Sequence, residues 1–236
     1  MTIRNRGKES NDDKLFGKKW QPIFIEAIQD MSFLLTRGYG EKSSIQLVGN
    51  RYRMNTRQQK ALLRMSAPKN SILNRKQKAV SKESIKNQTL LIDGFNLLIL
   101  LENALSQAYI FKSQDDAYRD ISGVHGSYKR VTQTEKAIIL VGDILQQLEV
   151  KSVHWYFDSP ISNSGRLKTM LCQIADKQKF DWQVTLVTNP DIVLAKSEAI
   201  IISSDAWILD ECKQWFNLPA LIIEEYLKSE NIIYAE

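Results

Sequence analysis

Residues 90–99 read LLIDGFNLLI, a short apolar run that ends on an aspartate and is followed by a turn and a second apolar run. The first run predicts a strand over 90–93, and the second predicts a helix from Phe95 to about Ala108. The same alternation continues to the end of the chain. It predicts strands at 153–158, 182–188, 199–203 and 220–223, and helices at about 135–148, 165–179, from 190 and from 206. The helix near 135 is expected to open with a capping box formed by Thr132 and Glu135. Alternating strands and helices favour right-handed crossovers, so residues 89–236 are expected to form a three-layer α/β sandwich with a mostly parallel central sheet.

Charge divides the chain into two parts. Its 32 Lys and Arg and 27 Asp and Glu give a net charge of +5 over 236 residues. Residues 1–88 hold 19 basic and 7 acidic side chains, a net of +12, whereas residues 89–236 hold 13 and 20, a net of −7. This division excludes a uniformly basic, histone-like protein and indicates a polyanionic partner for the first part. Two cysteines exclude a disulfide framework, and with no signal peptide or long apolar run we expect a cytoplasmic protein without membrane contact.

The basic part is expected to be mainly helical. Residues 1–17 mix charges with Gly, Ser and Asn and predict a flexible tail, and residues 18–88 predict a basic module with a connector. Apolar residues spaced three and four apart predict a helix over 18–36. Asn55 is placed to cap a second helix that runs to Arg64. Pro68 and the polar run after it predict the connector.

Aspartates follow four of the predicted strands. They are Asp93, Asp158, Asp191 and Asp205. Because parallel strands end at one edge of a sheet, where ligands bind, these carboxylates are expected to lie together. Helix capping is an equal alternative for Asp191 and Asp205. Oxygen ligands without His or Cys favour one or two Mg²⁺ or Mn²⁺ ions, and such ions support metal-assisted phosphodiester hydrolysis.

The motifs around these aspartates resemble the PIN-like nuclease superfamily, and its NYN branch in particular, over about residues 89–223. They are Asp93-Gly94-Phe95-Asn96, Asp158 at a strand end, Asp191 at a helix start, and Ser203-Ser204-Asp205. The resemblance implies a metal-dependent ribonuclease in which the four aspartates hold the metal, Asn96 steadies the site or substrate, and Ser204 orients a ligand. The whole chain also resembles a prokaryotic family that pairs a basic N-terminal module with such a domain, a likeness that implies no activity.

Two loops add candidate substrate contacts. The segment after Asp158 offers groups suited to a phosphate, with a Ser-capped helix as the alternative: Ser162, Asn163, Ser164, Arg166 and Lys168. The long insertion before residue 135 offers His125, Lys129 and Arg130. Glu102 lies inside an apolar helical run, where a buried carboxylate is costly unless it faces a metal or a cation. As a candidate site residue it ranks below the strand-end aspartates.

Cations and tyrosines alternate in the basic module. The candidate nucleic-acid contacts are Arg37, Tyr39, Lys42, Arg51, Tyr52, Arg53, Arg57, Lys60 and Arg64. Cations neutralise phosphates and tyrosines stack on unpaired bases, which favours RNA or single-stranded DNA as the partner. Alternatively the module docks on the acidic part, and Arg53 or Arg57 completes the site. The leading hypothesis is a metal-dependent nuclease acting on RNA; a non-catalytic RNA-binding protein and a phosphatase or nucleotide hydrolase are the alternatives.

Overall fold

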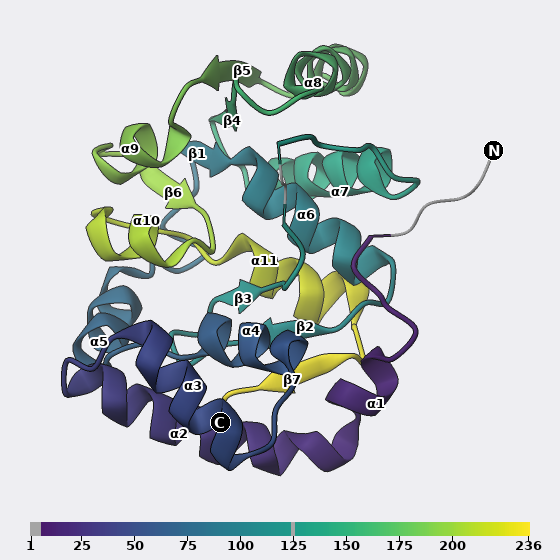
Figure 1. Cartoon of the computed structure of the whole chain (residues 1–236). Coiled ribbons are helices and arrows are strands. Elements are labelled where there is room, and N and C mark those ends of the chain that lie inside the picture. Colours follow the sequence, from purple (N-terminus) through teal and green to yellow (C-terminus); the bar gives the residue numbers. More distant parts are fainter. Residues whose placement is uncertain (1–5, 124–125) are drawn as a thin grey trace.

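The computed structural model describes residues 6–123 and 126–236. A four-stranded parallel sheet lies at the centre of its α/β part (Figure 1). Its strands are β1 (Thr89–Asp93), β4 (Ser152–Asp158), β5 (Trp182–Val187) and β6 (Ile200–Ile202), in the order β5-β4-β1-β6. In the register, Ile92 of β1 lies opposite Trp155 of β4 and Ile202 of β6. The predicted three-layer α/β sandwich with a parallel central sheet is therefore confirmed.

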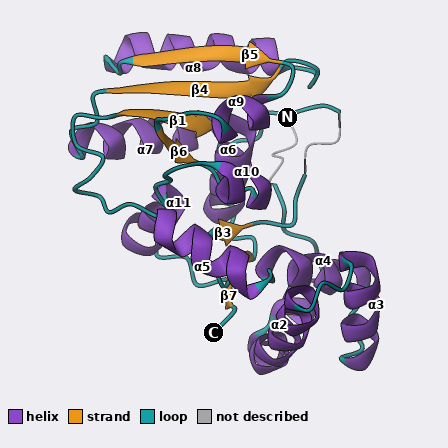
Figure 2. Cartoon of the chain, turned by 90° about the vertical axis from the view of Figure 1, so that its left-hand side faces the viewer, coloured by secondary structure: helices purple, strands orange, loops and turns teal. Residues whose placement is uncertain are grey.

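Helices cover both faces of this sheet because side chains alternate along each strand. Leu90 and Ile92 join the core formed with α6 (Gly94–Leu105), α7 (Thr134–Gln147) and α8 (Ser164–Gln178). Leu91 points the other way and packs with α9 (Pro190–Ala195) and α10 (Ala206–Glu211), which lie in front of the sheet in Figure 2. This alternation places the apolar residues of one strand in two separate cores.

The strand order creates a switch point beside β1. The chain runs from β1 to β4 and β5 on one side and then returns to β6 on the other side of β1. The helices that precede and follow β6, α9 and α10, also lie on the opposite face from α6, α7 and α8. In open α/β sheets ligands bind at such a point, outside the carboxyl ends of the strands. The fold therefore predicts a ligand site at the carboxyl ends of β1 and β6.

The N-terminal part is helical and shares its core with later strands. Its helices are α1 (Asp12–Phe16), the short 3₁₀ helix η1 (Lys18–Trp20), α2 (Gln21–Thr36), α3 (Glu41–Arg51), α4 (Thr56–Met65) and α5 (Lys69–Lys78). A second sheet, in the order β3-β2-β7, contains β2 (Ile110–Lys112), β3 (Tyr118–Arg119) and β7 (Ile232–Tyr234). Buried residues of α2 and α4 pack against Phe111 of β2 and Ile233 of β7. The module and the end of the chain thus form one hydrophobic core.

The structure differs from the sequence-based expectation in three places. Residues 12–16, expected in a flexible tail, form α1, and its Phe16 is buried in the module core. Residues 220–223 are not a strand: they belong to α11 (Leu218–Leu221) and the π-helix η2 (Ile222–Leu227). Their apolar run is helical because Ile222 packs on the sheet while Ile223 packs toward β2 and β3. The predicted capping box of α7 is also absent, since Gln133 takes the capping position without a side-chain cap bond.

Within the described part of the chain, no helix combines the length and the apolar character that crossing a membrane requires.

Candidate functional site

Asp93 lies at the centre of the carboxyl edge of the sheet. It is the last residue of β1, is buried, and accepts a hydrogen bond of 2.8 Å at Oδ2 from the hydroxyl of Ser203, which follows β6. The next residue is Gly94, where a Cβ atom would lie 2.3 Å from the ring of Phe157. A glycine is therefore needed for the turn after Asp93 to pack this closely on β4.

Asp205 and Asp191 occupy helix starts in different ways. Asp205 caps α10, because its Oδ1 accepts from the backbone N–H groups of Trp207 and Ile208 at 2.9 and 3.2 Å. Capping uses only one of its oxygens, so it is compatible with binding a ligand through Oδ2. Asp191 is not a cap: Asn189 caps α9, and Asp191 stands exposed in the first turn. The capping alternative thus applies to Asp205 and not to Asp191.

The four aspartates lie close enough to repel one another. Burial, and then the charges of Asp191 and Asp205, raise the pKa of Asp93 to about 7. Burial, followed by the charges of Asp205 and Asp158, raises the pKa of Asp191, and burial raises that of Asp158. Asp191 therefore interacts with Asp205 and Asp158 and contributes to the raised pKa of Asp93. The switch point thus gathers negative charge from the ends of all four strands.

These carboxylates interact electrostatically without meeting at one point. Across residues 6–123 and 126–236, no three His, Cys, Asp or Glu side chains form a group that could hold one metal ion. The donor chemistry nevertheless fits Mg²⁺ or Mn²⁺, since all the ligands are oxygens. Beside them, the buried hydroxyl of Ser204 has no hydrogen-bond partner in the described structure. An orphaned buried hydroxyl costs free energy, which a bound ligand or its water would relieve.

Asn96 and Ser204 connect the first and last strands of the site. The side-chain oxygen Oδ1 of Asn96 accepts a hydrogen bond of 2.8 Å from the Ser204 backbone N–H. Both residues line a pocket of about 180 Å³ that adjoins the aspartates. Asn96 therefore steadies the turn before Asp205 through the backbone.

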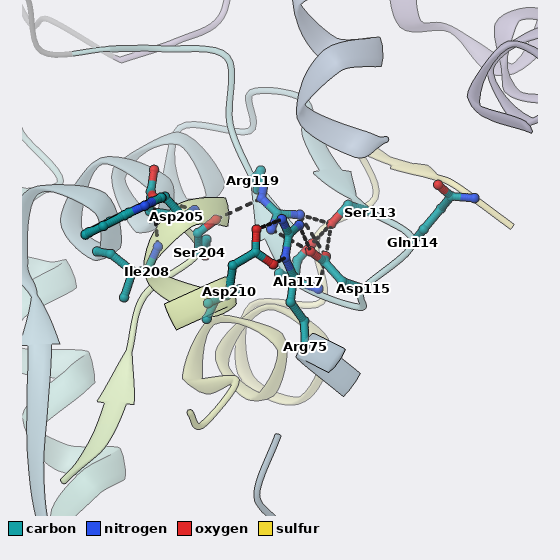
Figure 3. A network of polar contacts seen from close by, with 12 residues as sticks. Arg75, Ser113, Gln114, Asp115, Ala117, Arg119, Ser204, Asp205, Ile208 and Asp210 are labelled. Atoms are coloured by element: carbon teal, nitrogen blue, oxygen red, sulfur yellow. Dashed lines mark hydrogen bonds and ion pairs between the residues drawn. The ribbon is translucent and has the colours of Figure 1, made fainter. Parts of the chain in front are cut away.

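A buried ion network supports that turn (Figure 3). Arg119 donates to the Ser204 carbonyl at 2.8 Å and pairs with both oxygens of Asp115 at 2.8 and 2.7 Å. Arg75 of α5 joins Asp115 at 2.8 Å and Asp210 of α10 at 2.7 Å. Burial alone would raise the pKa of Asp115, but the two guanidinium groups hold it below its usual range. The network fixes the basic module to the Ser203–Asp205 turn, and the sequence offered no local signal for it.

The two candidate loops meet at a second pocket. Lys129, Arg130, Asn163 and Arg166 line a space of about 330 Å³. Asn163 adopts a left-handed backbone (φ 72°), and its amide donates to the Tyr128 carbonyl at 2.9 Å. This bond joins residues that are 35 positions apart. The structure therefore brings together four of the predicted substrate contacts.

The other predicted loop residues are placed differently. Ser162 is exposed, and its backbone pairs with that of Ser127 in an isolated parallel bridge. Ser164 is buried and Lys168 is half-buried, and neither lines the pocket. His125 lies outside the described residues.

Comparison with protein families assigns the sheet-containing part of the chain. Residues 82–221, more than half of the chain, match the family described as "Domain of unknown function (DUF5616)". The chain belongs to the DUF5616 family. The match in this DUF5616 protein includes all four aspartates and ends before β7. Residues 23–78, which contain α2 to α5, match a second family, "Protein of unknown function (DUF434)".

One relative of this DUF5616 protein extends over nearly the whole chain. The protein is similar to the "Uncharacterized protein MJ0935" of Methanocaldococcus jannaschii, with 31% identity over 207 residues. The alignment covers 87% of this chain and 98% of the relative. No solved structure matches the DUF5616 protein. The alignment is long enough to include residues of both matched segments of this chain.

Glu102 of the DUF5616 segment faces a cation, as its burial requires. Its Oε2 pairs with Arg6 at 2.5 Å, and its Oε1 accepts from Thr134 at 2.5 Å and from the Tyr128 hydroxyl. The side chain is fully buried in this cage. Glu102 therefore anchors the N-terminal segment and is separate from the aspartates.

Several of the predicted cations in the DUF434 segment are engaged within the protein. Arg57 pairs with buried Asp12 at 2.6 Å, and Arg51 pairs with Asp30 at 3.3 Å. The Tyr52 hydroxyl donates to Asp30 at 2.9 Å. These side chains stabilise the module, and Arg57 is not available to complete the site.

The remaining cations of the DUF434 segment present their charge to solvent. Arg37 stacks over Phe33, and Tyr39, Lys42 and Arg53 are exposed. Lys60 and Arg64 lie one turn apart on α4, and no ion pair engages either of them within the described residues. Arg64 lines the pocket that adjoins the aspartates. Arg64, rather than Arg53 or Arg57, is thus the module residue that reaches the site region.

Proposed function

We propose that this protein is a Mg²⁺- or Mn²⁺-dependent nuclease that hydrolyses phosphodiester bonds in RNA. The observation that carries the proposal is the mutual repulsion of aspartates at the carboxyl ends of the strands: Asp191 and Asp205 raise the pKa of Asp93, and Asp205 and Asp158 raise that of Asp191. Acidic clusters of this kind are stable at neutral pH when cations neutralise them. The oxygen-only donor set favours Mg²⁺ or Mn²⁺.

Each aspartate contributes a different kind of contact to this proposed site. Asp93 is held rigidly, because it is buried and bonded to Ser203. The Oδ1 of Asp205 caps α10, while its Oδ2 accepts no hydrogen bond from the described residues. Asp191 is exposed and Asp158 is half-buried, so both remain accessible to a substrate. When bound, the metal would supply an activated water and stabilise the charge that develops at phosphorus.

Surface charge supports RNA as the substrate. Lys129, Arg130 and Arg166 border one pocket near the start of α8, and Arg64 borders the other. Arg130 shares its charge with Glu135 at 3.2 Å, an exposed pair that a phosphate can readily replace. Cations at two separate pockets suit an extended polyanion better than a small phosphate ester.

A cleavage assay with matched aspartate variants tests the proposal. Purified protein is incubated with fluorescent single-stranded RNA in Mg²⁺, in Mn²⁺ and in excess chelator, and the products are separated on a gel. We expect cleavage only with metal, and its loss in Asp93→Asn. Asp181→Asn is the control, because Asp181 is exposed and precedes β5 at the opposite edge of the sheet.

Three outcomes would contradict the nuclease. RNA binding without turnover in any metal would indicate a binding protein, and turnover of mononucleotides or phosphate monoesters alone would indicate a phosphatase. Cleavage that persists in Asp93→Asn would remove the aspartates from the mechanism. RNA binding by Asp93→Asn, measured in parallel, separates lost chemistry from lost affinity.

A further inference from the structure

The pocket beside the aspartates joins the two parts of the chain. Residues of α4, α6, β3 and the turn after β6 surround its volume of about 180 Å³. The lining includes Arg64, Phe95, Asn96, Tyr118, Asp120 and Ser204. Asn96 is three residues past Asp93 and Ser204 immediately precedes Asp205. A group bound in this pocket would therefore adjoin the reacting phosphate of a substrate.

Several polar groups of this pocket have hydrogen-bonding capacity that no described residue uses. One carboxylate oxygen of Asp120 accepts from the Ser122 backbone at 2.6 Å, and the other oxygen has no hydrogen bond within the described chain. The buried Ser204 hydroxyl is unpaired there as well. The carbonyl of Asn96 is occupied by Ser204, which leaves its amide group to donate. Within the described chain, the pocket thus offers a carboxylate with one oxygen unbonded and the other bonded once, together with several donors.

The charges in the pocket have opposite signs and are not joined. Arg64, Lys60 and Arg6 all attract the Asp120 carboxylate, yet burial outweighs them and raises its pKa to about 6. Asp120 is therefore mostly ionised at pH 7.5 and acts as an acceptor. Among the ion pairs of the described residues, none links Asp120 to Arg64. A carboxylate and a guanidinium group that face the same space without pairing call for a ligand with both donors and acceptors.

This combination fits a nucleobase better than a phosphate. The Asp120 carboxylate would repel a phosphate, whereas buried apolar side chains such as Phe95 and Tyr118 suit a flat ring. The volume is below the roughly 300–1,000 Å³ of pockets for drug-sized ligands, so it admits one base rather than a longer segment. A base also explains why the wall carries both signs of charge.

Guanine provides the closest chemical match. Its N1–H and N2 amino groups offer two donors to one carboxylate, and its O6 and N7 acceptors suit an arginine. Adenine, cytosine and uracil each offer donors from a single nitrogen. We propose that the pocket lined by Arg64 and Asp120 binds an unpaired guanine of the substrate RNA, beside the phosphodiester to be cut. RNA as the source of the guanine rests on the proposed function. Because a paired guanine cannot offer these donors, the pocket selects single-stranded RNA.

A binding measurement with the full chain tests this assignment without requiring cleavage. The Asp93→Asn protein is titrated, by fluorescence anisotropy, into labelled hexamers of uridine that carry at one central position uracil, guanine, adenine or cytosine. We expect the guanine hexamer to bind roughly 10-fold or more tighter than the uridine hexamer, the scale of one good bidentate contact. Adding Asp120→Asn should reduce this preference to about 2-fold or less, because an amide offers only one acceptor oxygen.

Matched variants separate base recognition from general affinity. Asp116→Asn is the control for Asp120→Asn, since Asp116 is exposed and pairs with Lys76 outside the pocket; its preference should be unchanged. Arg64→Gln should also reduce the guanine preference. Arg37→Gln, a change of the same kind on the exposed side of the module, should weaken every hexamer equally. Thermal unfolding of each variant confirms that it is folded.

Specific results would overturn the guanine pocket. They are equal affinities for all four hexamers, a preference for another base, or a guanine preference that survives both Asp120→Asn and Arg64→Gln. Competition by inorganic phosphate that disappears in Arg64→Gln would make the pocket a phosphate site instead. Failure of the nuclease would show differently, as intact RNA in the cleavage assay, whatever the base preference.

Discussion

Replacing Asp93 by asparagine should stabilise the metal-free protein at alkaline pH. Burial and the neighbouring aspartates raise the pKa of Asp93 to about 7 from the usual 3.8. This difference corresponds to a cost of about 4 kcal/mol for keeping the carboxylate ionised above pH 7. Asparagine removes the charge and keeps an acceptor for Ser203, but it buries an amide group at a cost of about 1 kcal/mol or more. The expected net gain at pH 8 is about 2–3 kcal/mol, or about 4–12 °C in Tm for a chain of this size.

The sign of the pH dependence follows from the raised pKa. Between the unfolded value of 3.8 and the folded value of about 7, the folded protein holds a proton that the unfolded chain has lost. The contribution of Asp93 to the stability of the unsubstituted protein is therefore greatest below pH 3.8 and is lost as the pH rises through 7. The advantage of Asp93→Asn should accordingly shrink to less than about 1 kcal/mol at pH 5.

Urea unfolding at pH 5 and pH 8, followed by circular dichroism in chelator, measures both values. A second series at pH 8 in 10 mM Mg²⁺ should raise the stability of the unsubstituted protein and leave Asp93→Asn unchanged, since only the former binds the ion fully. An asparagine variant that gains nothing at pH 8, or gains equally at both pH values, would refute the electrostatic reasoning. An unsubstituted protein that ignores Mg²⁺ would refute the metal site.

Two further substitutions test the support of the site. Arg119→Lys keeps the charge but loses the paired bonds to Asp115 and the bond to the Ser204 carbonyl. It should lower the free energy of unfolding, measured in urea, by about 3 kcal/mol and slow cleavage. Arg37→Lys, in an exposed position, should leave the stability unchanged. Equal stability of the two variants would show that the network does not stabilise the fold. Gly94→Ala places a methyl group 2.3 Å from the Phe157 ring and should cost about 1–3 kcal/mol, while Gly165→Ala, with nothing within 4 Å, should be neutral or stabilising. A tolerated Gly94→Ala in thermal unfolding would mean that the turn after Asp93 can move.

The main sheet was predictable because its signals are local. A run of apolar residues ending on aspartate, as at 90–93, contains everything that is needed to recognise β1. In contrast, β2, β3 and β7 contain only two or three residues each, and β7 pairs with a strand more than a hundred positions earlier. The strand predicted at 220–223 was wrong because buried helices and buried strands are equally apolar, and periodicity cannot distinguish them over four residues.

Within the candidate site, the same distinction applies. The four aspartates could be found because parallel strands end at one edge, so their positions in sequence predict their place in space. The network of Arg75, Asp115, Arg119 and Asp210 could not, because it joins three segments whose proximity only the tertiary fold creates. The placement of Arg64 rather than Arg57 at the pocket was equally hidden, since the two are similar in sequence context and differ in whether an internal carboxylate engages them.

The strand β7 imposes an order on the biosynthesis of this protein. Gln21 at the start of α2 exchanges two hydrogen bonds with the backbone of Tyr234, at 2.7 and 3.1 Å, and Ile233 fills the core of the module. At synthesis rates of 5–20 residues per second, α2 and α4 leave the ribosome roughly 10–30 s before this strand is made. During that interval the nascent module carries an uncovered apolar surface, the kind of surface that chaperones bind. Helices α2 and α4 thus complete their packing only after β7 has emerged.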